Sequence, residues 1–338
     1  MQSKVIELSN LKTFFKLDEG ILKAVDGVSF RVQKQQTLGL IGESGCGKSV
    51  TAQSILRIVP PPGNIFSGEI ILHRERNQPL NLVELNQSGK EIRKIRGKEI
   101  SMIFQEPMTS LSPVHTVGKQ IVESILLHHT RNKNEAKEIA LEMLANVGIP
   151  NSSQRFYEYP HQLSGGLRQR VMIAMALSCH PSLLIADEPT TALDVTVQAQ
   201  ILELIKKFQD RLAMAVLYIT HDLGVMAEIA DEIAVMYLGK IVEYGGKRDI
   251  LKDPLHPYTD RLLKSIPRIG RKARVRLDAI EGTVPLPIGL PEMCRFYSRC
   301  PRSIEGICNK QIPSLLEIKK GHLVRCFLFH REKEEDHE

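Results

Sequence analysis

The stretch IGESGCGKSV, residues 41–50, places three glycines and a lysine between an apolar run and a segment of helical composition. The run TLGLIG (37–42) indicates a short strand, and the residues from Lys48 to about Ile58 indicate a helix. A phosphate-binding loop requires a strand, a glycine loop and a helix in this order. The stretch therefore predicts an α/β protein that binds a phosphorylated ligand.

The spacing of this loop matches the pattern G-x-x-x-x-G-K-S/T. Glycine permits backbone angles that turn successive N–H groups toward a polyphosphate, and the helix start adds its positive dipole end. A lysine in this position reaches the β and γ oxygens, and the following hydroxyl coordinates Mg²⁺. The pattern alone does not separate ATPases from GTPases or kinases. The candidate nucleotide-binding residues are Gly42, Ser44, Gly45, Cys46, Gly47, Lys48, Ser49 and Val50.

A second element is the apolar run LLIADEP at 183–189, which ends in two acids. It reads as a strand buried on both faces, and its polar end would lie at the edge of the sheet where α/β proteins bind ligands. Asp187 is suited to hold Mg²⁺ through water. Glu188 is the candidate general base that polarises a water in line with the γ-phosphate. Hydrolysis is therefore the expected reaction.

The segment LSGGLRQR at 163–170 resembles the signature sequence of ATP-binding cassette (ABC) proteins. Ser164, Gly165 and Gly166 place a hydroxyl and accessible backbone amides at a helix start, which makes a second anion site. The resemblance implies that this site binds the γ-phosphate of a nucleotide held by a partner subunit.

Further positions match the same family one by one. Gln105 resembles the glutamine that senses Mg²⁺ and water, and His221 resembles the switch histidine near the γ-phosphate. Residues 191–194, Thr191 to Asp194, resemble the loop that crosses the dimer interface, although serine is more frequent in the family at the first position. An aromatic side chain is expected to stack on adenine, and Phe15 fits the spacing better than Phe14.

The segment DPLHPYTDRLLKSIP (253–267) resembles the C-terminal extension of ATPase subunits from oligopeptide and dipeptide importers. His256, Pro257 and Tyr258 carry this match. The resemblance covers nearly the whole chain, but importers of nickel or other small solutes share parts of the tail and remain an alternative. A soluble ABC ATPase that acts on nucleic acid is a further alternative, although no long coiled-coil pattern supports it.

Four cysteines in the tail follow C-x₅-C-x₇-C-x₁₇-C, without the paired C-x₂-C of many zinc sites. Four thiolates favour zinc or an iron–sulfur cluster. The family resemblance ranks a 4Fe–4S cluster first and zinc second, with a structural role; unliganded or oxidised cysteines, and a redox-sensing module, remain open. The proposed ligands are Cys294, Cys300, Cys308 and Cys326.

Composition and charge are those of a globular protein of 338 residues, 42% hydrophobic, with a net charge of +6. No apolar run approaches the ~20 residues of a membrane helix, and the start lacks the pattern of a secretory signal, so we expect a cytoplasmic chain. The densest basic stretch, RIGRKARVR at 268–276, suits either an anionic surface or a solvated linker.

The resemblance implies an α/β fold with a RecA-like P-loop core, an antiparallel β subdomain, a helical subdomain at about 106–165 and a small cysteine-rich metal-binding extension. The expected boundaries are 1–255 for the ABC domain and 256–338 for the extension. Such a chain would hydrolyse ATP with Mg²⁺ to power peptide import. It would act peripherally at the cytoplasmic face of the membrane, with a second ATPase, two permeases and a solute-binding protein.

Overall fold

The computed structural model describes residues 3–74, 78–106, 110–191, 193–265, 280 and 282–330. The predicted basic stretch at 268–276 and Ala192 lie outside the described residues. The strands are β1 (Lys4–Leu17), β2 (Gly20–Gln33), β3 (Thr37–Ile41), β4 (Gly63–Leu72), β5 (Leu80–Asn81), β6 (Ile100–Ile103), β7 (Leu183–Asp187), β8 (Ala215–Thr220), β9 (Glu232–Tyr237), β10 (Lys240–Gly246), β11 (Leu316–Lys319) and β12 (His322–Val324). The helices are α1 (Lys48–Ile55), α2 (Lys90–Ile95), α4 (Val117–His128), α5 (Lys133–Asn146), α6 (Ser152–Arg155), α7 (Gly165–Leu177), α8 (Val195–Leu212), α9 (Leu223–Ile229), α10 (Lys247–Lys252) and α11 (Pro257–Lys264).

The chain divides into two compact units, which we describe separately. The first holds the described residues of Met1–Ile6, Val32–Thr37 and Leu72–Tyr218, and the second those of Glu7–Arg31, Leu38–Ile71 and Ile219–Glu338. No helix among the described residues is long and apolar enough to cross a membrane.

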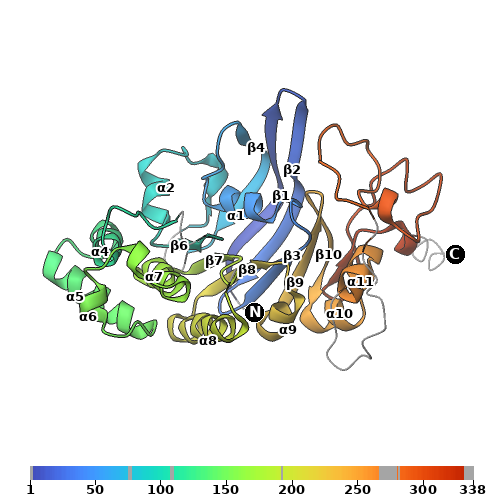
Figure 1. Cartoon of the computed structure of the whole chain (residues 1–338). Coiled ribbons are helices and arrows are strands. Elements are labelled where there is room, and N and C mark those ends of the chain that lie inside the picture. The colour runs from blue at the N-terminus through green and yellow to red at the C-terminus, as the bar shows by residue number, and fades with distance from the viewer. Residues whose placement is uncertain are drawn as a thin grey trace. The chain divides into compact units, whose positions relative to one another are not determined.

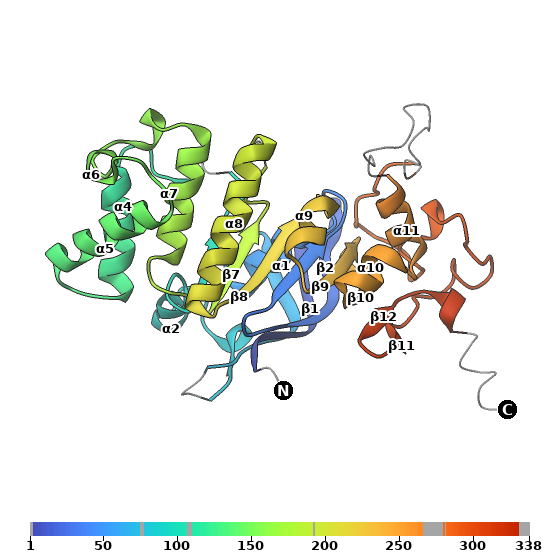
Figure 2. The same cartoon turned by 90° about the horizontal axis from the view of Figure 1, so that it is seen from below.

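The first unit pairs β6 with β7 in parallel and places β8 next to β7. Every residue of β7 is buried, as predicted for a strand covered on both faces. Helices α4, α5 and α6 gather beside α7 (Figures 1 and 2). Helix α5 begins where Asn132 accepts two backbone N–H groups, and it buries the apolar face that its sequence periodicity predicts.

The second unit carries the β2-β1-β4 sheet and a mixed sheet ordered β11-β12-β10-β9-β3. Strand β3 is parallel to β9, whereas β10, β12 and β11 follow in antiparallel pairs. Strand β12 comes from the C-terminal tail and pairs Val324 with Glu243 of β10. The tail thus extends the same sheet as the strand that precedes the phosphate loop.

Helix α1 ends earlier than the sequence predicts. Arg57 adopts a left-handed φ of 57°, and the N–H of Ile58 donates to the carbonyl of Gln53, which closes the helix in a Schellman-type turn. Glycine is the usual residue at this position of such a turn, so the arginine did not indicate from the sequence that the helix ends here.

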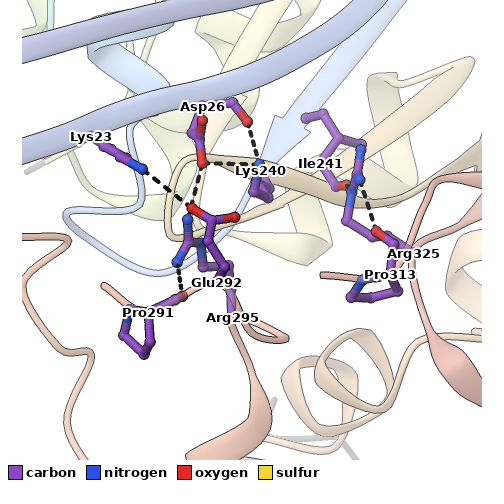
Figure 3. Close-up of polar contacts among 9 residues, drawn as sticks. All are labelled: Lys23, Asp26, Lys240, Ile241, Pro291, Glu292, Arg295, Pro313 and Arg325. Carbon is purple, nitrogen blue, oxygen red and sulfur yellow. Dashed lines mark hydrogen bonds and ion pairs between the residues drawn. The ribbon is translucent and has the colours of Figure 1, made fainter. Parts of the chain in front are cut away.

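Within the second unit, a buried ionic cluster attaches the C-terminal tail to strand residues Asp26 of β2 and Lys240 of β10 (Figure 3). The Asp26 carboxylate lies 2.9 Å from Lys240 Nζ and 3.1 Å from Nη2 of Arg295 in the tail. Burial raises the pKa of Asp26, but the hydrogen bonds and charges of Lys240 and Arg295 outweigh it and leave the pKa below its ordinary value. A more exposed pair, Lys23 with Glu292, lies 3.5 Å apart nearby.

Candidate active site

The phosphate loop lies in the second unit between β3 and α1, and close packing requires glycine at two of its positions, 42 and 47. Gly47 has a φ of 104°, and a Cβ there would lie 2.0 Å from the carbonyl oxygen of Ala24. A Cβ on Gly42 would lie 2.2 Å from the carbonyl oxygen of Met236. No side chain caps the start of α1, so its first N–H groups are available to an anion. This cradle fits a polyphosphate.

Lys48 lies inside the loop, where its side chain is buried. Its Nζ donates to the carbonyl oxygens of Gly42 at 2.8 Å and Glu43 at 3.1 Å. Cys46 is buried beside it, and burial raises the pKa of its thiol. Ser44 and Gly45 are exposed at the tip of the loop. Ser49 and Val50, in the first turn of α1, are half-buried.

The two aromatic candidates for adenine stacking have different surroundings, as neighbours on one strand should. Phe14 stacks on the exposed Phe66, with ring centroids 5.3 Å apart. Phe15 lies against Gly63, where an added Cβ would approach its ring to 2.5 Å. His221 is exposed directly after β8. The adenine role of Phe15 and the switch role of His221 stay predictions.

The first unit brings together Gln105, Glu188 and Thr191. Asp187 ends β7 and is buried, and the half-buried Glu188 follows it in a turn with a left-handed φ of 47°. The Glu188 carboxylate accepts hydrogen bonds from Gln105 Nε2 at 3.2 Å and Thr191 Oγ1 at 3.0 Å. A left-handed residue other than glycine costs free energy and is concentrated at functional sites. The turn therefore holds one carboxylate at a fixed place just beyond the buried Asp187.

The predicted second anion site forms the start of α7. Ser164 is its N-cap, and its Oγ accepts the N–H of Leu167 at 3.4 Å. A Cβ added to Gly165 would meet no heavy atom within 4 Å, and one added to Gly166 would lie 3.2 Å from Val197. Packing inside the described chain therefore does not explain the glycine at position 165.

Two contacts give structural roles to residues of these motifs. Asp194 caps α8, because its Oδ1 accepts the N–H of Val197 at 2.9 Å. The buried Gln169 of α7 donates to the carbonyl of Pro189, so it connects the signature helix to the turn after Glu188. Gln169 was not among the site residues predicted from the sequence. Its place within LSGGLRQR was the available signal.

The four tail cysteines lie near one another as free thiols. Burial raises the pKa of Cys294 to about 11 and that of Cys326 to about 12, and the other thiols of the group add to both rises. The described residues nevertheless contain no group of three or more His, Cys, Asp or Glu side chains arranged to hold a metal ion. The described residues therefore do not support the predicted metal-binding extension.

Comparison with known families and structures agrees with the motifs. The chain matches the family models "ABC transporter" over residues 25–191 and "Oligopeptide/dipeptide transporter, C-terminal region" over residues 242–308. The solved dimer of MJ0796, a bacterial ABC transporter cassette, superposes with a TM-score of 0.63 at 27% identity, covering 72% of this chain and 99% of that one. The fold and the site thus define an ABC transporter ATPase cassette, for which ATP with Mg²⁺ is the substrate.

Relatives from Bacillus subtilis (strain 168) narrow the class. The oligopeptide transport ATP-binding protein AppD is 50% identical over 98% of both chains, and the dipeptide transport ATP-binding protein DppD is 48% identical over 96% of this chain and 95% of its own. The chain belongs to the family of ATP-binding proteins of oligopeptide and dipeptide ABC transporters. These are transport ATPases, and membership implies membrane permease and substrate-binding partners.

Proposed function

We propose that this chain hydrolyses ATP to power import of dipeptides and oligopeptides through an ABC transporter, acting peripherally at the cytoplasmic face of the membrane. Family membership supports the transport role. The observation that carries the chemistry is the Glu188 carboxylate, which Gln105 and Thr191 hold directly beyond the buried Asp187. We assign residues 1–255 to the cassette, with a helical subdomain at about 106–165, and residues 256–338 to the extension.

The residues divide the reaction between binding and proton transfer. The amides of the loop and the Lys48 ammonium bind the phosphates. Ser49, Asp187 and Gln105 are the residues that would supply oxygen ligands to Mg²⁺, and the ion would neutralise charge on the nucleotide phosphates. Glu188 takes the proton of a water whose oxygen bonds to the γ-phosphorus while the bond to the ADP oxygen breaks. His221 would contact the γ-phosphate.

We propose that Ser164, Gly165 and Gly166 act on a nucleotide held by a second ATPase subunit, in a head-to-tail heterodimer. The space at Gly165 supports this role, because no heavy atom of the described residues would lie within 4 Å of a Cβ there, which leaves room for an approaching ligand. Asp194 would lie at the same dimer interface. Closure of two such subunits around ATP is the two-state change that would drive the permeases.

We keep ligation of a 4Fe–4S cluster by the four tail cysteines as a proposal, with zinc as the alternative. Its support is the family resemblance that the four-cysteine pattern carries. No step of ATP hydrolysis passes through this group. Iron and zinc analysis of an anaerobic preparation tests it, with about four irons per chain expected for the cluster.

The Glu188→Gln variant tests the proposed hydrolysis. The amide keeps the shape of the side chain but cannot accept the proton, so ATP binding should persist while turnover by the assembled transporter falls by at least about 100-fold. Glu203→Gln on α8 is a matched control and should keep normal turnover. Turnover within tenfold of normal in Glu188→Gln would remove Glu188 from the role of base.

A further inference from the structure

Glu43 is the acidic residue of the phosphate loop, and its carbonyl, its N–H and its carboxylate each form a polar contact. The contacts of the N–H and the carboxylate are with the C-terminal part of the second unit. The Glu43 carbonyl accepts from Lys48, as described above. The Glu43 N–H donates to the hydroxyl of Tyr258 at 2.9 Å. The Glu43 carboxylate pairs with Arg299 of the tail. Because these contacts fix Glu43 from three sides, they set the conformation of the loop next to Lys48.

Arg299 binds Glu43 in the bidentate geometry that a guanidinium and a carboxylate favour. Nη1 lies 2.8 Å from Oε2 and Nη2 lies 3.0 Å from Oε1. The Arg299 side chain is 5% exposed, and Nη1 also donates to the Tyr237 hydroxyl at 3.3 Å. Such a shielded, two-point ion pair is stronger and better oriented than a surface pair.

Arg299 lies in a compact turn of the tail between Cys294 and Cys300. The N–H of Tyr297 donates to the carbonyl of Cys294, and the N–H of Cys300 donates to the carbonyl of Tyr297. Phe296 of this turn packs against Tyr258, with ring centroids 5.4 Å apart. Two side chains of one short turn thus support the loop, one by charge and one by packing.

We propose that Arg299 is a positioning residue for ATP binding, which holds Glu43 and thereby keeps the phosphate loop in its binding conformation. The pair also neutralises a carboxylate that would otherwise repel the nucleotide phosphates. Since Arg299 directly precedes Cys300, whatever orders the cysteine segment also governs how firmly the loop is held. The inference rests on the proposed function, because it requires that the loop binds ATP.

A double-mutant cycle on the full chain tests the inference. Arg299→Gln should weaken equilibrium binding of ATP by about five- to tenfold, in the range of ordinary coupling between sites. In the Glu43→Gln background the same change should cost less than about twofold, because the pair and the repulsive carboxylate are already gone. In the assembled transporter, Arg299→Gln should raise KM for ATP and leave kcat within about twofold.

Controls separate failure of this inference from failure of the proposed function. Lys48→Ala should weaken ATP binding strongly, and normal binding there would refute the phosphate-loop assignment itself.

Glu292→Gln breaks an exposed tail contact away from the loop and should leave ATP affinity unchanged. The inference is overturned if Arg299→Gln binds ATP normally while Lys48→Ala does not, or if it costs the same in both backgrounds, which would mark a purely structural arginine. If Arg299→Gln does not fold, Arg299→Lys takes its place: it keeps the charge and loses the two-point contact, so it should still weaken ATP binding, and normal binding there overturns the inference as well.

Discussion

Replacing Asp26 by asparagine should loosen the tail more than any surface change of equal size. Asp26 is the shared anion of Lys240 and Arg295, whose side chains are only 11% and 4% exposed. Asparagine keeps the shape and removes the charge, so Lys240 and Arg295, which flank Asp26 in Figure 3, lose their shared anion. Removing one partner of a buried ion pair costs about 3–5 kcal/mol.

Both cations keep one hydrogen bond without the Asp26 carboxylate, which should bring the cost below that range. Lys240 keeps a hydrogen bond to the Asp26 main-chain carbonyl at 2.8 Å, and Arg295 keeps one to the carbonyl of Pro291 at 2.9 Å. We therefore expect a loss of about 2–3 kcal/mol in the free energy of tail opening, which is roughly a 30- to 150-fold larger open fraction.

Limited proteolysis of the tail, read by mass spectrometry, measures this opening, because cleavage follows the open population when opening and closing are fast. The matched control is Glu292→Gln, whose pair with Lys23 involves a side chain that is 73% exposed. That change should cost less than about 1 kcal/mol. If Asp26→Asn is cleaved no faster than Glu292→Gln, the buried cluster does not anchor the tail.

Three further outcomes are expected. The pKa of Asp26 is lower in the folded protein than in the unfolded chain, where it is about 4. The stability that Asp26 contributes is therefore present above about pH 4 and is lost as the pH falls through the folded pKa. Proteolysis of the tail should rise below about pH 4, and it should rise less steeply in Asp26→Asn. Ser164→Arg should bind ATP normally as a single chain, measured by equilibrium binding, yet fail to form the closed dimer with its partner subunit. Cys300→Ser should lose bound iron and raise tail proteolysis, and an unchanged metal content would remove Cys300 from the ligand set.

The motifs that could be predicted from the sequence are those whose functional residues lie within one short contiguous segment. The phosphate loop, the acids that end β7 and the start of α7 all lie where their strings predict. Contacts between distant segments had no such signal: Glu43 and Arg299 are 256 positions apart, and nothing in either local sequence marks the pair. The short strand β12, residues His322–Val324, was missed because three residues carry too little alternation.

Glu243 shows why the tail and the strand before it form one core. This β10 residue is fully buried, and its carboxylate accepts the N–H groups of Leu255 at 2.7 Å and His256 at 3.0 Å and lies 2.8 Å from His322 Nε2 of β12. A carboxylate is stable in such a place only when its oxygens are satisfied, so β10 requires the tail that covers it. The match to the peptide-transporter C-terminal region accordingly begins at residue 242, inside β10. The region that matches the peptide-transporter family model thus includes a strand of the sheet that carries the phosphate loop, and its Arg299 forms an ion pair with Glu43 of that loop.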